Sequence, residues 1–231
     1  MQGATGDIFA TKGLEYLIVI GYLLVLMGVW RLLSPPKLAR VLGMKSQRRA
    51  VAPHQWFALP SGVFYHQGHG WAVPTDGDTV RVGMDDFAQR LVGKPDAIVL
   101  PQVGERLEQG AEGWALQFGT ERIPMVSPVS GEVVLVNPAL GESVDAVNAD
   151  PYGSGWLCEV RVSSPRAAFK NLLSGELARS WMRQVVERLR QMPTASLGVV
   201  MPDGGVPVSG FARVIAPDDW TNVARYLLLS S

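Results

Sequence analysis

The sequence is poor in cysteine and histidine: Cys158 is its one cysteine, and three of its 231 residues are histidines. A single cysteine excludes a disulfide framework and any cysteine-ligated zinc or iron–sulfur site. Three histidines leave little material for a metal centre, and we expect none. The formal net charge is zero, with 21 basic and 21 acidic residues, so the chain lacks the positive footprint of a bulk nucleic-acid binder.

The neutral total hides a separation of charge along the chain. Residues 31–49 carry six positive side chains and no negative one. Residues 50–163 carry 14 acidic and 6 basic side chains, a net charge of −8. Such blocks indicate a basic collar followed by an acidic globular body.

The first part of the chain contains an uncharged run from Tyr16 to Trp30 within a 21-residue, mostly apolar segment, 13–33. At about 1.5 Å per residue, a helix of this length spans roughly 30 Å, the thickness of a bilayer core. A cleaved secretory signal would carry its positive charge before the run, whereas here the charge follows it. A buried core helix with no polar face would need protein on every side. We therefore expect one transmembrane helix over 13–33, positioned by interfacial aromatics, small contact residues and a flanking charge: Tyr16, Gly21, Gly28, Trp30 and Arg31.

The flanking charge also predicts the orientation of this segment. The positive-inside rule places the basic side in the cytoplasm. We expect residues 1–12 to be a short extracytoplasmic tail, residues 34–58 a basic juxtamembrane linker, and the remainder a cytoplasmic domain at a bacterial-type inner membrane. The linker either contacts anionic lipid head groups or carries topology signals alone.

From about Leu59 the pattern changes to short β runs separated by glycine, proline and aspartate. The clearest runs are 79–82, 97–100, 132–136 and 156–162, with a short helix predicted over 85–91. Short strands with frequent turn signals indicate a mainly β domain, either a small barrel or a sandwich.

Several separated motifs then resemble the H protein of the glycine cleavage system, in the order that this family has them. They are His69-Gly70-Trp71, Val82–Gln89, Leu100–Gly104, Ser127–Val133 (SPVSGEV), Asn137–Leu140 and Val147–Leu157. The resemblance covers roughly 59–190 and includes a C-terminal helix. It implies the barrel-sandwich hybrid fold of lipoyl and biotinyl carriers for a domain over 59–192, with flanking helices.

The resemblance also implies where a carrier would bear its lipoyl group. The family's acceptor lysine stands seven residues before the serine that is Ser127 here, and that position is Thr120. No lysine occurs between Lys94 and Lys170. A threonine hydroxyl cannot form the lipoyl amide, and the guanidinium of Arg122 stays protonated. We therefore expect a degenerate member of the family with no lipoyl cofactor.

Without a lipoyl group, two candidate contact surfaces remain: the hairpin that contains Thr120 and a basic helix near residue 180. A helix is predicted from an N-cap at Ser174 to Gln191, with Leu177, Trp181, Val185 and Leu189 on its buried side. The alternatives are neutral drift for the hairpin and an ordinary solvated face for the helix. The candidate contact residues are Phe118, Gly119, Thr120, Glu121, Arg122, Arg179, Arg183 and Arg190.

Three other features have ordinary structural interpretations. The pair His66 and His69 has no third ligand nearby, so a structural histidine is favoured over a metal site. Asp85 and Asp86 fit a helix N-cap and a first-turn acid better than a paired acid site. Cys158 fits an inert core thiol.

Residues 193–231 lie beyond the resemblance. Ser196–Met201 and Val206–Ile215 predict a β-hairpin around Asp203-Gly204-Gly205, and Asp218 is expected to cap a terminal helix. This unit either packs on the barrel or forms a separate docking element.

These features together predict a non-catalytic, membrane-anchored accessory or scaffold subunit. Its expected partners are the lipid bilayer and the subunits of a membrane complex, respiratory or photosynthetic, with no nucleic acid. Two alternatives remain open: a tethered lipoyl or acyl carrier that uses an unconventional lysine, and a transient assembly factor.

Overall fold

The computed structural model divides the chain into two compact units, residues 1–49 and 50–231. The residues that the structure describes are 16–27, 29, 56–141, 143–192 and 207–229. Each unit is considered by itself.

The first unit contains a helix over residues 16–27 and 29, whose side chains are exposed. Within the described parts of the chain, no helix combines the length and the apolar character needed to cross a membrane. The transmembrane helix over 13–33 therefore stays a prediction. Of its anchor residues, the described helix contains Tyr16 and Gly21, whereas Gly28, Trp30 and Arg31 fall outside the described residues, as does most of the 34–58 linker.

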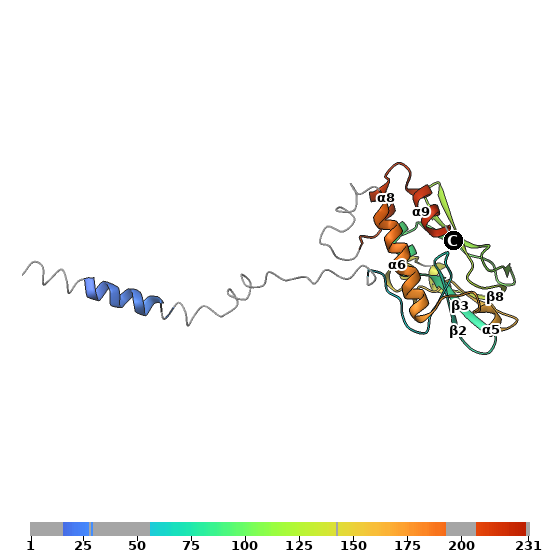
Figure 1. Cartoon of the computed structure of the whole chain (residues 1–231), viewed down its shortest axis with the longest axis horizontal. Helices are drawn as coiled ribbons and strands as arrows, with labels where there is room; N and C mark the ends of the chain where they lie inside the picture. The colour runs from blue at the N-terminus through green and yellow to red at the C-terminus, as the bar shows by residue number, and fades with distance from the viewer. Residues whose placement is uncertain (1–15, 28, 30–55, 142, 193–206, 230–231) are drawn as a thin grey trace, which may run out of the picture. The chain divides into compact units, whose positions relative to one another are not determined.

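The second unit is built on two antiparallel sheets (Figure 1). The six-stranded sheet has the order β1 (Phe64–Tyr65), β2 (Gly70–Pro74), β3 (Thr79–Met84), β9 (Cys158–Arg161), β8 (Gly131–Val136) and β5 (Arg106–Leu107). The three-stranded sheet has the order β4 (Ala97–Val99), β6 (Glu112–Phe118) and β7 (Glu121–Val126). The mainly β prediction is therefore confirmed.

Strand β3 begins with the alternation of buried apolar and outward polar side chains that is typical of a half-buried strand. In β3, Val80 and Val82 are fully buried, and the intervening Arg81 points outward to pair with Glu159 of β9. Three predicted strands correspond closely to β3, β4 and β8. The fourth, predicted over 156–162, is β9, which is shorter at both ends. The backbone N–H groups of Leu157 and Val162 still donate to Val82 and Asp78, beside β9.

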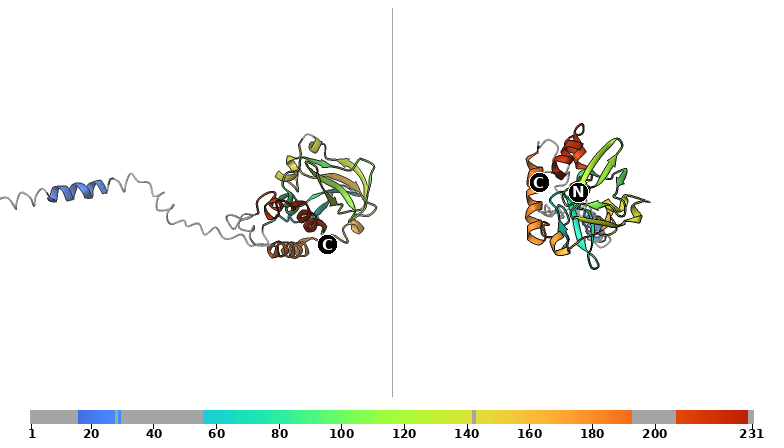
Figure 2. Two further views of the ribbon diagram at one scale, coloured as in Figure 1. Left: turned by 90° about the horizontal axis from the view of Figure 1, so that it is seen from above. Right: turned by 90° about the vertical axis from the view of Figure 1, so that its right-hand side faces the viewer.

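Helices cover the sheets (Figure 2). Those of the second unit are α3 (Asp86–Val92), α4 (Asp145–Ala149), α5 (Pro165–Ala168), α6 (Gly175–Gln191), α8 (Phe211–Ile215) and α9 (Trp220–Leu229), with a 3₁₀ turn η2 (Pro138–Gly141). The helix predicted over 85–91 is α3, and the helix predicted from Ser174 is α6.

The predicted buried side of α6 is wrong at Leu177, whose side chain is 68% exposed. Trp181, Val185 and Leu189 are buried as expected, and Ala178 is buried in place of Leu177. Each step of four residues turns a helix about 40° past a full turn. Three such steps therefore rotate Leu177 about 120° away from Leu189.

The β-hairpin predicted within 193–231 is wrong over 211–215, which form helix α8. Its other predicted strand, 196–201, and its turn lie outside the described residues. Gly210, with φ +75°, precedes α8, and Phe211 and Ala212 are fully buried. Burial of these side chains outweighs the β propensity of Val214 and Ile215.

The terminal helix α9 begins one residue later than predicted. Asp219, and not Asp218, directly precedes it, and the Asp219 carbonyl accepts the Val223 N–H at 3.2 Å. The buried side of α9 consists of Ala224, Leu227 and Leu228. Both α8 and α9 pack on the β domain, with α9 against β7 and α8 against α3.

Candidate functional site

The hairpin β6–β7 places Thr120 at an exposed apex. Phe118 pairs with Glu121 across the two strands, so Gly119 and Thr120 form a two-residue turn. Gly119 has φ +57°, a conformation that glycine adopts without steric cost at the first central position of such turns. The residue seven positions before Ser127 is thus the tip of a tight hairpin.

The tip is held from the side of the β4 strand. The Gly119 N–H donates to Asp96 Oδ2 at 2.6 Å, and Gln117 Nε2 donates to the Gly119 carbonyl at 2.6 Å. Both backbone polar groups of Gly119 are therefore satisfied by side chains. The bond to the Asp96 carboxylate is charge-assisted, and such bonds are among the stronger hydrogen bonds in proteins.

The β7 side of the hairpin is held by α9. Arg225 Nη2 donates to the Arg122 carbonyl at 2.9 Å and lies 3.9 Å from Glu121 Oε2. The Arg122 side chain itself pairs with Glu112 across the hairpin, and that hydrogen bond raises the Arg122 pKa. The guanidinium therefore stays charged and is no acyl acceptor.

Phe118 lies in a cluster of aromatic rings and one cation. Its ring meets Trp220 of α9 edge-on, with centroids 5.1 Å apart. The Arg213 guanidinium lies 3.8 Å from the Trp220 centroid and 4.7 Å from that of Phe118. Arg213 Nη1 also donates to the Val92 carbonyl at 2.6 Å. Phe118, expected as a contact residue, is thus buried within the molecule, whereas Gly119, Thr120, Glu121 and Arg122 are exposed.

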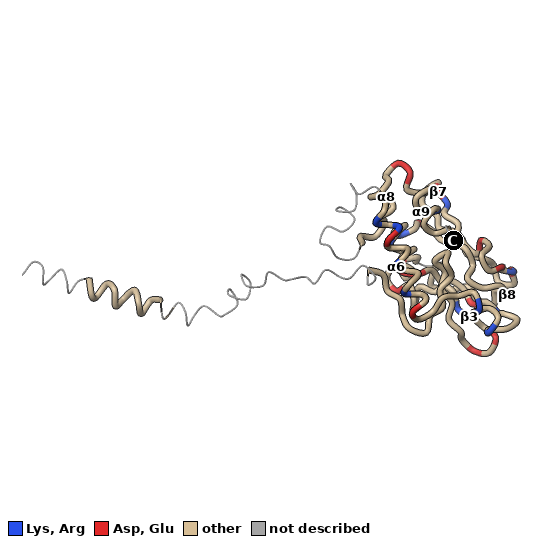
Figure 3. Tube along the Cα trace, viewed as in Figure 1, with Lys and Arg blue, Asp and Glu red and all other residues tan. Residues whose placement is uncertain are grey.

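The three arginines proposed as contacts on α6 are exposed. Figure 3 marks the basic positions among the described residues in blue. Arg179 is engaged by Glu176, with Nη2 to Oε1 at 2.6 Å, and this pair lowers the Glu176 pKa. The Arg190 guanidinium lies 5.1 Å from the centroid of the Trp56 ring. Arg183 is also on the solvent side of the helix. Their role in contacting a partner stays a prediction.

His69 and Asp85 form a buried pair. His69 Nδ1 lies 2.8 Å from Asp85 Oδ2, and both side chains are essentially inaccessible. The imidazole stacks on Phe87 with centroids 4.4 Å apart and lies 4.9 Å from Trp181 of α6. His66 instead accepts the Gly68 N–H at its Nδ1. The described residues contain no group of three or more potential metal ligands.

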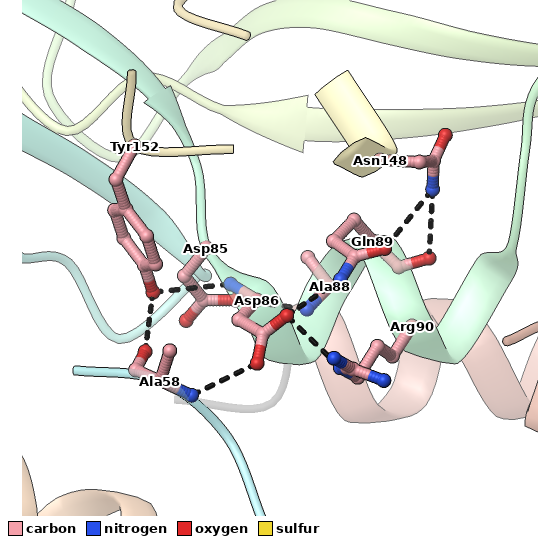
Figure 4. A network of polar contacts seen from close by, with 8 residues as sticks. All are labelled: Ala58, Asp85, Asp86, Ala88, Gln89, Arg90, Asn148 and Tyr152. Carbon is pink, nitrogen blue, oxygen red and sulfur yellow. Dashed lines mark hydrogen bonds and ion pairs between the residues drawn. The ribbon is translucent and has the colours of Figure 1, made fainter. Parts of the chain in front are cut away.

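Asp85 and Asp86 act as the predicted cap and first-turn acid (Figure 4). Asp85 Oδ1 accepts the Ala88 N–H at 2.8 Å, which caps α3. Asp86 Oδ2 accepts the Ala58 N–H at 2.8 Å, and its Oδ1 accepts from Arg90 at 2.9 Å.

This network also fixes the chain where it enters the domain. The Tyr152 hydroxyl donates to the Ala58 carbonyl at 2.7 Å and receives the Asp86 N–H at 3.1 Å (Figure 4). Burial, reinforced by the nearby Asp85 carboxylate, raises the Tyr152 pKa well above its usual value. The phenol therefore stays protonated and able to donate. The arrangement ties residue 58 to the start of α3.

Sequence reasoning did not predict that three residues of the C-terminal helices contact the hairpin: Arg213, Trp220 and Arg225. They lie about 100 positions from the strands they contact, at spacings with no local signal. The family motifs could not indicate them either, because those motifs end before residue 193.

Comparisons with known proteins agree with the motifs. Residues 63–185 match the family model "Glycine cleavage H-protein". A probable glycine cleavage system H protein of Natronomonas pharaonis is 44% identical over 104 residues, 45% of this chain and 82% of the relative. The H protein of Mycobacterium avium is 37% identical over 129 residues, 54% of this chain and 98% of the relative. The H protein of Thermus thermophilus is 39% identical over 103 residues, 45% of this chain and 80% of the relative.

A crystal structure of the H protein from Mycobacterium marinum aligns with a TM-score of 0.46 and 27% identity, covering 55% of this chain and 98% of that one. The family model alone spans more than half of the present sequence. The chain belongs to the glycine cleavage H-protein family.

Proposed function

We propose that the protein is a non-catalytic accessory or scaffold subunit of a larger membrane complex, respiratory or photosynthetic, in which an H-protein-like domain makes protein contacts without a lipoyl group. The observation that carries this proposal is the hairpin apex, Gly119-Thr120, which offers no primary amine. Acylation of a lysine to an amide needs such an amine at an exposed turn. A hydroxyl at this position forms no lipoyl amide.

The neighbouring lysines offer poor substitutes. Lys94 follows α3, and its ammonium pairs with Asp145, whose pKa the pair lowers. Lys170 follows the short helix α5. Neither lysine stands at a two-residue hairpin turn, where an acyl arm would project freely.

The anchoring part of the proposal rests on the sequence. The apolar segment 13–33 has the length of a bilayer-spanning helix, and the basic residues that follow it favour a cytoplasmic location for the domain. A tether would hold the domain beside membrane-embedded partners and raise its effective concentration there. The exposed hairpin tip and the α6 arginines are the proposed contact surfaces.

The lipoyl part of the proposal is tested by the intact mass of the full chain purified from its own cells. We expect the unmodified mass. An added mass of about 188 Da, the value for an octanoyl dithiolane amide, on Lys94 or Lys170 would support the alternative of a carrier with an unconventional lysine.

The anchoring and partner parts are tested by membrane fractionation and by affinity purification in mild detergent. We expect the chain to stay in the membrane fraction after an alkaline wash and to purify with stoichiometric membrane subunits. Recovery from the wash supernatant contradicts the anchor, and a clean monomer contradicts the scaffold. Co-purification with assembly intermediates but not with the finished complex favours the transient assembly factor.

A further inference from the structure

The C-terminal helices α8 and α9 lie outside the family match, which ends at residue 185. They are nevertheless part of the domain core. Phe211, Ala212 and Leu228 are fully buried, and Phe211 packs on Phe87 of α3 with ring centroids 5.9 Å apart. Helices α8 and α9 therefore share the hydrophobic core of the domain.

The start of α8 is placed by close backbone contact with the end of α3. The Gly210 N–H donates to the Arg90 carbonyl at 2.7 Å. A Cβ atom on Gly93 would lie 3.1 Å from the Gly210 Cα. Two glycines thus allow the two segments to approach without side chains between them.

Side chains of α8 and α9 contact the hairpin that carries Thr120. Trp220 and Arg213 cover Phe118, the last residue of β6. Arg225 reaches the backbone of Arg122 and the carboxylate of Glu121, the first two residues of β7. These contacts lie within two residues of the apex.

The other flank of the hairpin is also occupied. β4 pairs with β6 there, and Asp96 holds the Gly119 N–H. β7 would otherwise be the free edge of the three-stranded sheet, and α9 lies against it. At the apex, Gly119, Thr120, Glu121 and Arg122 are the exposed residues among those that the structure describes.

We propose that α8 and α9 form a built-in cover on the β7 flank, which keeps acyl-attaching enzymes away from the hairpin whatever residue stands at position 120. An enzyme that acylates a tip lysine must bring the amine to about 3 Å from the acyl carbon. A specific enzyme–protein contact buries about 800 Å² per partner, or some 20–30 residues. That contact has to extend from the turn down the flanks, and here α9 occupies one of them. The inference rests on the proposed function, in which the lipoyl group is lost. It adds a second barrier to lipoylation, besides the missing lysine.

The test restores the missing amine in the full chain by Thr120→Lys. The variant is incubated with a lipoate–protein ligase, lipoate and ATP, with an authentic glycine cleavage H protein as the positive control. In the reaction the lysine amine attacks the carbonyl of lipoyl adenylate, an amide forms, and AMP leaves with release of a proton. We expect the control to gain about 188 Da and the Thr120→Lys variant to stay at least tenfold less modified.

Uncovering the flank is expected to restore the reaction. Trp220→Ala and Arg225→Ala are each combined with Thr120→Lys, and circular dichroism checks that each variant is folded. Arg225 lies at the surface, so its removal leaves the core intact. Arg179→Ala, also combined with Thr120→Lys, is the matched control, because it removes a distant surface arginine on α6.

The outcomes separate clearly. Acylation of a folded uncovered variant, with the Arg179→Ala control unmodified, supports the cover. Efficient acylation of Thr120→Lys alone overturns it, and so does failure of every uncovered variant while the authentic H protein is modified. A lipoyl mass on the unmutated chain would contradict the proposed function and leave this comparison valid.

Discussion

At the residue scale, Asp85 shows how one side chain supports two elements. One carboxylate oxygen caps α3 through the Ala88 N–H, and the other holds His69. His69 has φ +62°, an uncommon conformation for a residue other than glycine. Its ring contacts with Phe87 and Trp181 and its bond to Asp85 hold this conformation in place. The pair therefore links β2, α3 and α6.

Replacement of Asp85 tests this double role. Asp85→Ala removes an N-cap, worth about 1 kcal/mol, and leaves a buried imidazole unpaired, at about 1–3 kcal/mol. We expect unfolding free energy in urea to fall by about 2–4 kcal/mol. Asp85→Asn keeps one oxygen to cap the Ala88 N–H, and its amide NH2 group faces His69 Nδ1, which accepts from it in the neutral tautomer protonated at Nε2. We expect a loss of about 1 kcal/mol. Equal losses for both variants would contradict the double role.

Cys158 allows a prediction for the alkaline range. The thiol is buried in β9, and burial raises its pKa from 9.0 to about 12. Between these values the unfolded chain has released the proton and the folded chain still holds it. Stability therefore falls as pH rises through this window, by up to about 1.4 kcal/mol per pH unit.

The measurement compares urea unfolding of the natural chain and of Cys158→Ala from pH 8 to 11. The buried tyrosines titrate alike in both proteins, so the difference in slope belongs to the cysteine. Parallel stability curves would show that the thiol is accessible to solvent in the folded protein.

At the scale of elements, α6 shows that helical geometry selects which leucine stabilises the fold. Leu189 is fully buried, whereas Leu177 is 68% exposed on the same helix. The arginines lie on the exposed side of α6. On its apolar side, Trp181 packs against Tyr65 of β1 and against His69, which directly precedes β2. Helix and sheet therefore share one core.

Leucine-to-alanine substitutions at a buried and at an exposed position of α6 test which side of the helix faces the core. Leu189→Ala removes buried methyl groups and leaves a cavity, so we expect a loss of about 2–5 kcal/mol in unfolding free energy. Leu177→Ala changes an exposed position and should stay within about 0.5 kcal/mol. Chemical denaturation of both variants measures the contrast, and a larger loss at Leu177 would place the helix in a different rotation.

At the scale of the whole molecule, the family domain (63–185) and the C-terminal helices α8 and α9 share a single hydrophobic core. The close approach of Gly93 to Gly210 is the point where the two are joined. The cation and rings of Arg213, Phe118 and Trp220 extend that contact to the hairpin. A substitution that disturbs the contact between Gly93 and Gly210 should therefore also destabilise the hairpin.

Gly93→Ala tests the junction against a matched glycine. Gly93 has φ +78° and faces the Gly210 backbone, whereas Gly110 has φ +83° and open space around its Cβ position. Alanine at Gly110 bears backbone strain of about 1–2 kcal/mol. Alanine at Gly93, where ψ is −163°, bears about 1–3 kcal/mol, because this region is open essentially to glycine alone. We expect Gly93→Ala to cost about 1–2 kcal/mol more, because a methyl group presses on backbone atoms. Hydrogen exchange should also rise in α8, α9 and β7 for Gly93→Ala alone, and indistinguishable variants would argue against the junction.

Patterns along the chain were enough to predict the mainly β class, three of the four named strands, the helices α3 and α6, the capping role of Asp85 and the position of Thr120. These features depend on local periodicity, on capping chemistry or on family motifs, and all three can be read along the chain. The missing lysine is also a property of composition, so no structure was needed to find it.

Long-range packing sets the conformation of 211–215, the burial of Phe118 and the position of α9 beside the hairpin. Val206–Ile215 has β propensity, but the gain from burying Phe211 and Ala212 depends on partners about 120 residues away. Arg225 and Arg122 are separated by 103 positions, and no periodic pattern relates them. Their contact exists because the folded core brings both segments to one edge of the sheet, and long-range packing of that kind leaves no local mark in a sequence.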